Sequence, residues 1–371
     1  MKKKVLNSFL FHHGRAFVVF LIITLTLGIL AYFYSGIQVE KRTAEQMLHR
    51  EQVISRAGAR SIESFISLTK KSFLVLSRNP NLFADSEKTH SVLNNFLSDW
   101  EGTPLTGVIL IDKEGKVSSV ATKEITQEES EMDFSGRDYF VWARDADEGE
   151  VYVGQPVISR VGTTKGEFII TLATPLRYNG EFKGVLVSAI LVSKLTENYL
   201  EPLKVSDQSK VYLVDSSGLV VYSDITPILG LNFFDYLEEH PFVGSDTIIS
   251  VLRERIANIM KEHEGKIEYI RNDYDNKTNF RKWLLTYATV NIATTAKQEN
   301  WILAVETPNE DALLFANMLF RYQTYVLIFC IVSIISLVVI AITSAKIRER
   351  EAFLKGFSEG KKVGRGKENK H

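Results

Sequence analysis

Two long apolar runs stand at opposite ends of the chain. Residues 16–34 (AFVVFLIITLTLGILAYFY) contain no charged side chain, and neither do residues 324–345 (TYVLIFCIVSIISLVVIAITSA). At about 1.5 Å per residue, each run is long enough as a helix to cross the ~30 Å hydrocarbon core of a bilayer. The pattern therefore predicts two transmembrane helices, over 16–35 and 323–345, on either side of a large polar segment, 36–322.

The segment after the first run predicts a long amphipathic helix over residues 37–78. Its apolar residues recur at steps of three, seven or eight, which is one stripe at the 3.6-residue period of an α-helix. The stripe consists of Met47, Ile54, Ile62, Phe65, Phe73 and Leu76. No proline interrupts it before Asn79-Pro80, where we expect the helix to end. A second, shorter helix fits residues 90–100.

The hydrophobic pattern then changes to short apolar runs separated by turns. Residues 107–121 (GVILIDKEGKVSSVA) predict a strand, an Asp-x-x-Gly turn and a second strand, and residues 210–223 (KVYLVDSSGLVVYS) repeat that order. The two turns match at an offset of 103 residues, Asp112 with Asp215 and Gly115 with Gly218. Such a repeat predicts two copies of one α/β module.

Each predicted module also ends in strands of its own. These strands lie within 166–190, joined by a Tyr-Asn-Gly turn at 178–180, and at 281–290 and 300–308. Residues 246–263 have a helical pattern between them. We therefore expect an α+β fold, with a long N-terminal helix that carries a first module at 79–200 and a second at 201–308.

The distribution of charge predicts how the chain is oriented in the membrane. The 371 residues are 45% hydrophobic and 24% charged, which is typical of a folded chain, but the net charge of −1 hides a segregation. Residues 1–16 carry four cationic side chains, and residues 345–371 carry nine against four glutamates, so the middle is strongly acidic. Lys and Arg on the terminal side of both runs predict a cytoplasmic N-terminus (1–15), a basic cytoplasmic tail (346–371) and an extracytoplasmic middle at the cell membrane.

A cleaved signal peptide is the alternative interpretation of the first run. Its apolar stretch exceeds the about 7–15 residues usual for a signal peptide, and no convincing small-x-small cleavage site follows it. The only cysteine, Cys330, lies in the second run. The outer segment is therefore expected to contain no disulfide and to depend on its hydrophobic core.

One stretch, 136-GRDYFVWARDADEGEVYVGQPV-157, combines an arginine with many aromatic rings. Together with TLATPL at 171–176, GEFKGVLVSAILVSKL at 180–195 and the closing strand WILAVETP at 301–308, it resembles double Cache (dCache) sensor domains. Such domains form the extracytoplasmic part of many bacterial chemoreceptors, sensor kinases and cyclic-dinucleotide enzymes. The resemblance covers about residues 36–322 and implies two tandem PAS-like modules, the first of them membrane-distal and holding the ligand pocket, the second membrane-proximal.

The resemblance also implies a set of ligand-binding residues. Arg137 would hold a ligand carboxylate, since a guanidinium can donate two parallel hydrogen bonds to it. The predicted set is Arg137, Tyr139, Phe140, Tyr152, Gln155 and Thr171. The alternative for Arg137 is a structural arginine, paired with Asp138 or Asp145 or stacked on a ring. Trp142 is expected to pack in the module core.

Three positions depart from the pattern of the members that bind amino acids. Those members usually carry a tyrosine and an aspartate near Val157 and Ser159, and a further aspartate near Ala189, to pair with the ligand ammonium. An apolar residue cannot replace such a carboxylate in a desolvated site. The departures therefore favour a small organic acid without an amine over an α-amino acid.

No other chemistry emerges from the sequence. The seven histidines show no metal-ligand spacing, and no nucleotide-binding or hydrolase motif is present, so we expect no enzyme activity, metal or cofactor. The acidic run 124–133 is interpreted as a solvated loop and the sequon at Asn276 as a chance match. The basic tail has two interpretations, contact of its lysines with anionic lipid or plain positive-inside anchoring, and neither involves nucleic acid.

The expected output is a signal across the membrane. The 26 residues after the second run hold no kinase, cyclase or methyl-accepting segment, so we expect a homodimeric sensor that acts on a cytoplasmic partner in trans. One alternative is the sensor half of a truncated or split chemoreceptor, sensor kinase or diguanylate cyclase. Another is an exported scaffold that docks a second protein.

Overall fold

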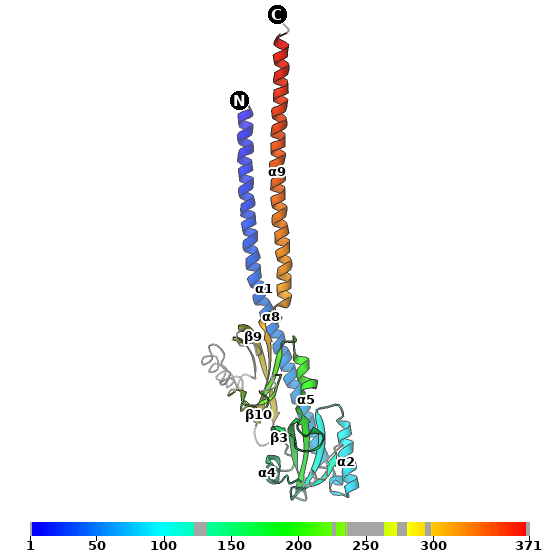
Figure 1. Cartoon of the computed structure of the whole chain (residues 1–371). Coiled ribbons are helices and arrows are strands. Elements are labelled where there is room, and N and C mark those ends of the chain that lie inside the picture. Colours follow the sequence, from blue (N-terminus) through cyan, green and yellow to red (C-terminus); the bar gives the residue numbers. More distant parts are fainter. Residues whose placement is uncertain are drawn as a thin grey trace. The chain divides into compact units, whose positions relative to one another are not determined.

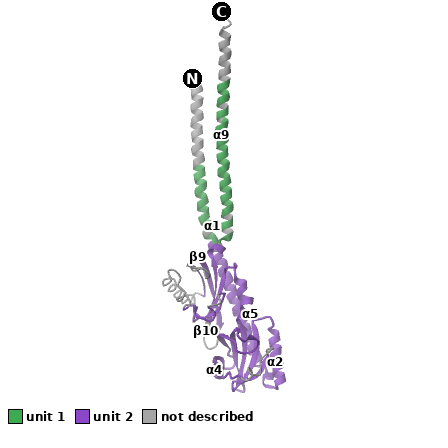
Figure 2. Ribbon diagram, in the orientation of Figure 1, with its two compact units in different colours: residues 1–43, 313–371 green, residues 44–312 purple. Residues whose placement is uncertain are grey.

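Residues 44–312 fold around two β-sheets, whereas residues 1–43 and 313–371 form a separate helical unit (Figure 2). The computed structural model describes residues 2–121, 132–224, 228–233, 235, 263–272, 280–293 and 298–368. Three predictions fall largely outside these residues. They are the helix at 246–263, the acidic run at 124–133 and the sequon at Asn276.

The two sheets are antiparallel, five-stranded and identical in strand order. The first has the order β2-β1-β5-β4-β3 and the second β7-β6-β10-β9-β8. The first sheet consists of β1 (Leu105–Asp112), β2 (Val117–Ala121), β3 (Tyr152–Ile158), β4 (Phe168–Tyr178) and β5 (Glu181–Leu191). The second consists of β6 (Lys210–Val214), β7 (Val220–Ser223), β8 (Glu264–Asn272), β9 (Phe280–Ala293) and β10 (Gln298–Pro308). The repeat predicted from the sequence is confirmed as a duplicated sheet.

The turns that suggested the repeat are built alike. The carboxylates of Asp112 and Asp215 each accept two backbone N–H groups of their own turn, at 2.8 to 3.0 Å. Gly115 and Gly218 follow with φ of +88° and +89°, a left-handed conformation that glycine adopts without strain. Short polar side chains and a glycine at fixed spacing therefore specify both turns.

A single helix, α1 (Lys2–Ser77), packs against one face of both sheets (Figure 1). It ends where the sequence predicted, and the Asn79 side chain accepts the N–H of Asn81 to open the following turn, η1 (Pro80–Phe83). The predicted stripe is confirmed: Ile62, Phe65, Phe73 and Leu76 are buried, and Met47 and Ile54 are partly buried. One hydrophobic cluster thus runs from the first sheet along α1 to the second sheet.

The predicted helix at 90–100 begins earlier than expected. The helix α2 spans Ser86–Asp99, and the Asp85 carboxylate caps it by accepting the N–H of Lys88 at 2.9 Å. An aspartate at the N-cap position satisfies a backbone donor that has no partner inside the helix. The capping residue, rather than the first apolar residue, therefore sets where this helix starts.

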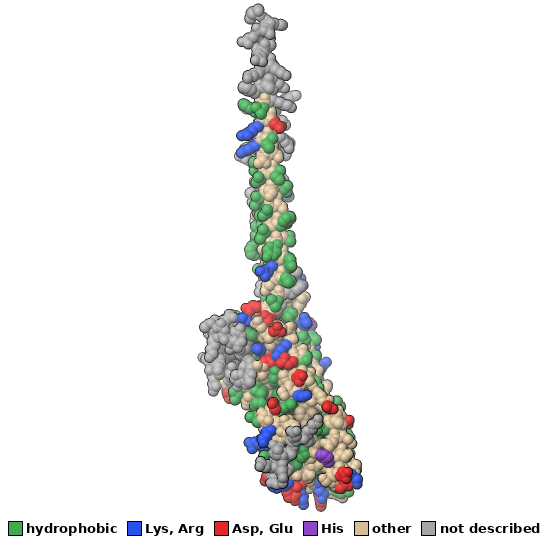
Figure 3. Space-filling view, turned by 45° about the vertical axis from the view of Figure 1, so that its right-hand side comes forward, with side chains coloured by type: hydrophobic (Ala, Val, Ile, Leu, Met, Phe, Trp, Pro, Cys, Tyr) green, Lys and Arg blue, Asp and Glu red, His purple; other side chains and the backbone are tan. Residues whose placement is uncertain are grey.

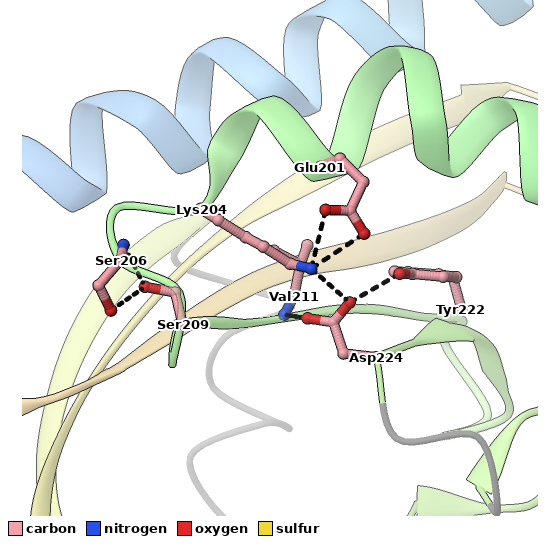
Figure 4. Close-up of polar contacts among 7 residues, drawn as sticks. All are labelled: Glu201, Lys204, Ser206, Ser209, Val211, Tyr222 and Asp224. Atoms are coloured by element: carbon pink, nitrogen blue, oxygen red, sulfur yellow. Dashed lines mark hydrogen bonds and ion pairs between the residues drawn. The ribbon is translucent and has the colours of Figure 1, made fainter.

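The connection from the first sheet to the second runs through α5 (Val192–Leu195), η3 (Thr196–Leu200) and η4 (Glu201–Leu203). Figure 4 shows the polar contacts that fasten it. The Lys204 ammonium lies 2.8 Å from the Glu201 carboxylate and 3.2 Å from that of Asp224. Asp224 also accepts the Tyr222 hydroxyl at 2.7 Å and the Val211 N–H at 2.8 Å. The connection is therefore tied directly to β6 and β7.

The helical unit contains the N-terminal part of α1 and the helix α9 (Leu314–Glu368), which follows the short α8 (Asn309–Ala312) of the two-sheet unit. Within it, the Tyr32 hydroxyl is hydrogen-bonded to Thr324, and the Tyr32 ring meets Phe320 edge to face. Among the described residues, one helical segment, Phe320–Leu354, is long and apolar enough to cross a membrane. In Figure 3, hydrophobic side chains (green) are exposed along the narrow part that corresponds to the helical unit. The predicted run 324–345 lies inside that segment.

Candidate functional site

A small cavity lies on the face of the first sheet that does not pack against α1. Strand alternation separates the two faces, because successive side chains point to opposite sides of a sheet. Its floor is made by Ile109, Ile111, Ile169, Thr171, Val187 and Ala189. The alternate residues Val108, Leu110, Ile170, Leu172, Leu186 and Ile190 belong to the core on the α1 side. The cavity has a volume of about 100 Å³.

Arg137 lies at the rim of the cavity, directly before the short helix α4 (Asp138–Asp145). Its backbone is extended, and its carbonyl accepts the N–H groups of Phe140 and Val141 to begin the helix. The side chain is half-buried, and within the described residues its guanidinium has no hydrogen-bond or ion-pair partner. The pairing with Asp138 or Asp145 that would make it a structural arginine is not formed.

Tyr139 lines the cavity beside Arg137. Burial raises the pKa of its hydroxyl above the usual range, and the nearby Arg137 charge opposes that shift only in part. The phenol therefore stays protonated at any physiological pH and can donate a hydrogen bond into the cavity.

The hairpin loop between β3 and β4 closes one side of the cavity. Ser159 is buried there, and its hydroxyl is hydrogen-bonded to Thr164 at 2.9 Å and to the Val161 carbonyl at 3.1 Å. Arg160 also lines the cavity from this loop. Sequence reasoning did not include these loop residues in the binding set. The sequence did contain a signal for them. Residues 159–164 directly follow the strand that ends the GRDYFVWA…YVGQPV stretch, so they had to lie beside any pocket at the end of that strand.

Three of the six predicted residues lie outside the cavity lining. Phe140 is 1% exposed and lies in the core between α4 and the first sheet, where its ring meets Phe182 edge to face. Tyr152 packs on Trp142, which lies in the same core as predicted. The Gln155 amide donates to the Asp215 carboxylate of the second sheet at 3.2 Å. The structure thus brings Arg137, Tyr139 and Thr171 together, and ligand contact by any of the six stays a prediction.

The described lining has an unbalanced charge. It contains the two arginines, 137 and 160, but neither aspartate nor glutamate. Val157, Ser159 and Ala189, the positions at which a carboxylate or tyrosine was missing from the sequence, all line the cavity. Two guanidinium groups in a described lining that has no carboxylate favour a negatively charged ligand.

Comparison with known proteins gives the same fold. The structure is similar to the ligand-binding domain of the Pseudomonas fluorescens chemoreceptor CtaA in complex with L-serine (13% identity, 72% of this chain and 99% of that chain, TM-score 0.51). It also resembles the extracellular domain of the putative histidine kinase rpHK1S-Z16 (15%, 74% and 97%, 0.51) and Methyl-accepting Chemotaxis protein X (14%, 72% and 99%, 0.53).

Sequence comparison is more specific. No curated protein matches the chain at a significant level. The family model dCache_1, described as a Cache domain, matches residues 38–316 and thus all of both sheets and the part of α1 that packs on them. The chain therefore belongs to the dCache_1 family of Cache domains.

Proposed function

We propose that this chain is a membrane-anchored extracytoplasmic sensor that binds a small carboxylate without an amino group in its membrane-distal module, the first sheet. The observation that carries the proposal is the Arg137 guanidinium, which has no partner among the described residues, at a cavity whose described lining has no carboxylate. A carboxylate ligand would accept two parallel hydrogen bonds from the guanidinium, and the Tyr139 hydroxyl would be a third donor beside it.

The size and polarity of the cavity narrow the ligand class. Its volume of about 100 Å³ is well below the roughly 300–1,000 Å³ of sites for drug-sized molecules, so the ligand has few heavy atoms. The floor is almost entirely aliphatic, which suits a short apolar tail beyond the carboxylate.

The same cavity disfavours an ammonium group. The ligand-binding domain of CtaA is known with L-serine and with L-isoleucine. In the present chain, Val157 and Ala189 offer no anion at the cavity, and burying an unpaired ammonium costs several kcal/mol. An organic acid such as acetate, propionate or lactate is therefore favoured over the α-amino acid of the same size.

The proposed topology follows the two apolar runs. The chain would cross the cell membrane twice, with both termini in the cytoplasm and residues 36–322 outside, as the flanking Lys and Arg predict. It would act as a non-enzymatic homodimer, in which ligand binding shifts α1 and α9 between two states that a cytoplasmic signalling partner distinguishes. Such a shift requires only that the ligand bind one state more tightly than the other.

Calorimetric titration of the full chain in lipid nanodiscs tests the proposal. Short carboxylates are expected to bind and, at about 100 times Kd, to stabilise the protein by about 2.7 kcal/mol, whereas the matching amino acids do not. Arg137→Ala should abolish this binding, and Arg144→Ala, an exposed arginine on the same helix, serves as the control. Full affinity of Arg137→Ala would refute the carboxylate assignment, and tight binding of L-alanine would refute the exclusion of amines. A chain that no small molecule stabilises would instead support the docking scaffold.

A further inference from the structure

The helix α1 carries a carboxyl group into the core of the second sheet. Glu51 is 0% exposed, one turn from the buried Leu48, which packs on Leu284 of β9. One turn further along, Ser55 is hydrogen-bonded to Thr286 of β9 at 2.7 Å. Neither carboxyl oxygen of Glu51 makes a hydrogen bond of regular geometry to a described residue, and the nearby polar group that acts on it is the Thr307 hydroxyl. An ionised carboxylate so placed would cost several kcal/mol, because one hydroxyl cannot replace its hydration.

A second buried carboxyl group lies close to the first. Glu306 of β10 is also 0% exposed, and it accepts the hydroxyl of Tyr212 at 2.9 Å and that of Tyr269. The charge on Glu51 disfavours the ionised form of Glu306, whereas Lys210 of β6 favours it. Of the described groups that act on this pair, Lys210 is the cation. The hydroxyls of Tyr212 and Tyr269 also contact Glu306, and the Thr307 hydroxyl acts on Glu51. Two neighbouring buried carboxyl groups cannot both ionise without a large repulsion.

We propose that Glu51 and Glu306 form a pH-sensitive switch in the membrane-proximal module, which holds α1 against the second sheet when both groups are protonated and loosens that contact when they ionise. The complete burial of Glu51, with at most one hydroxyl near its carboxyl group, requires one of two outcomes. Either Glu51 keeps its proton, or α1 moves far enough to admit water. The switch lies in the other sheet from the ligand cavity, uses none of its residues and goes beyond the proposed sensor function.

The titration of the pair falls in the physiological range. Burial raises the pKa of Glu51 to about 7, with the Thr307 hydroxyl opposing it. Burial likewise raises the pKa of Glu306 to about 8, against the lowering effects of Tyr212 and Lys210. The packed state therefore holds both protons below about pH 7 and releases them above about pH 8. Acid conditions favour tight packing of α1, and alkaline conditions favour its release.

Hydrogen exchange of the full chain in nanodiscs measures the release. After correction for intrinsic exchange rates, amides of α1 around Glu51 and of β10 are expected to lose more than about tenfold protection between pH ~6 and ~9. Amides of α1 around Phe73, at the first sheet, should change little. Glu51→Gln and Glu306→Gln, which mimic the neutral forms, should each reduce the pH dependence, and the double variant should remove it. Glu45→Gln, an exposed glutamate on the same helix, is the matched control and should behave as the wild type.

Infrared spectroscopy of the unmodified protein gives a readout that requires no variant to fold. Exposed glutamates are ionised at pH ~6, so a carboxylic-acid C=O band that persists there and disappears by pH ~9 reports buried acids. Absence of that band would overturn the proposal. So would wild-type protection that is independent of pH, or a double Gln variant that retains the full pH dependence. Because Arg137 plays no part in these measurements, failure of the switch and failure of the proposed carboxylate sensor are distinguishable.

Discussion

The two sheets of this protein share a strand order but carry very different side chains at one equivalent position. In the first sheet, β1 and β5 pair Gly107 with Ala189, and in the second, β6 and β10 pair Lys210 with Glu306. Gly107 and Lys210 are separated by the same 103 residues as the two aspartate turns. Ala189 and Glu306 are therefore counterparts. The small side chain forms part of a cavity floor, and the large acidic one fills its site together with tyrosine hydroxyls.

This difference shows how a duplicated scaffold can divide its tasks. In the first sheet the Arg137 guanidinium has no partner among the described residues and the described cavity lining has no anion, so the proposed carboxylate ligand would complete the site. The second sheet carries its own carboxyl group, Glu306, at the equivalent place. In the proposed switch, the change there is the protonation of that group and not the binding of an external ligand. The same contrast holds along α1, where the buried residues facing the first sheet are mainly apolar, whereas Glu51 faces the second.

The largest expected effect comes from the apolar end of α1. Phe73 is 0% exposed and packs against the ring of Phe96 in α2. Phe73→Ala should lower the free energy of unfolding by about 4 kcal/mol, because it leaves a cavity in the core. Urea unfolding at pH ~5 and ~9 should give the same loss at both, since no titratable group is removed. The exposed Val75→Ala is the control, and a loss that depends on pH would contradict the division of α1 into two halves.

The second effect is the pH dependence of stability itself. Glu51 keeps its proton in the folded state up to about pH 7, whereas an unfolded glutamate loses it near pH ~4.3, so stability falls as pH rises between those values. Glu51 alone should account for roughly 3 to 4 kcal/mol of that loss. Urea unfolding across the range measures it, and Glu51→Gln should flatten the curve by that amount. A curve that rises with pH in this range would contradict the burial of a protonated acid.

A third substitution makes the first sheet resemble the second. Ala189→Asp places a carboxylate in the cavity floor, where it competes with the ligand for Arg137. The affinity for short carboxylates should fall about 100-fold, or roughly 2.7 kcal/mol, in a calorimetric titration. Ala189→Asn has the same shape without the charge and separates repulsion from steric exclusion. Equal losses in the two variants would mean that charge at this position does not select the ligand.

The smallest effect is expected at the contact between the sheets. The Gln155 amide reaches the Asp215 carboxylate from an exposed position on β3. Gln155→Leu should cost about 1 kcal/mol of unfolding free energy or less, the usual contribution of one partly solvated hydrogen bond. Carboxylate affinity should remain within about twofold, because Gln155 does not line the cavity. A loss of carboxylate binding in this variant would instead indicate that Gln155 contacts the ligand, as the sequence predicted.

Local rules explain which parts of the fold were predictable. The Asp112 and Asp215 turns depend on short-range hydrogen bonds and one glycine each, so the repeat could be read from two residues at one offset. The hairpin turn at 178–180 was predictable for the same reason, since Asn179 and Gly180 both have positive φ. The apolar stripe of α1 likewise required only helical periodicity.

The candidate site was predictable only in part because side-chain direction depends on packing. Tyr139 and Phe140 are adjacent on a two-turn helix, and only the position of α4 on the sheet decides that one faces the cavity and the other the core. The contact of Gln155 with Asp215 depends on how the two sheets meet, which no local pattern encodes. Glu51 did leave a signal, since an acidic residue four positions after Met47 interrupts the stripe on its own face.

Because α1 is one continuous helix that packs on both sheets, it connects them mechanically. A helix is stiff along its axis, so a displacement of even one residue's rise, about 1.5 Å, at the Phe73 end changes where Glu51 sits in the second sheet. Ligand binding and protonation would then both act on the position of α1, and the two events would be coupled through it. Thermodynamic reciprocity sets the relation between them: the factor by which acid strengthens or weakens ligand binding equals the factor by which the ligand alters proton affinity. A receptor of this design would report a weighted balance of two chemical potentials rather than either concentration alone.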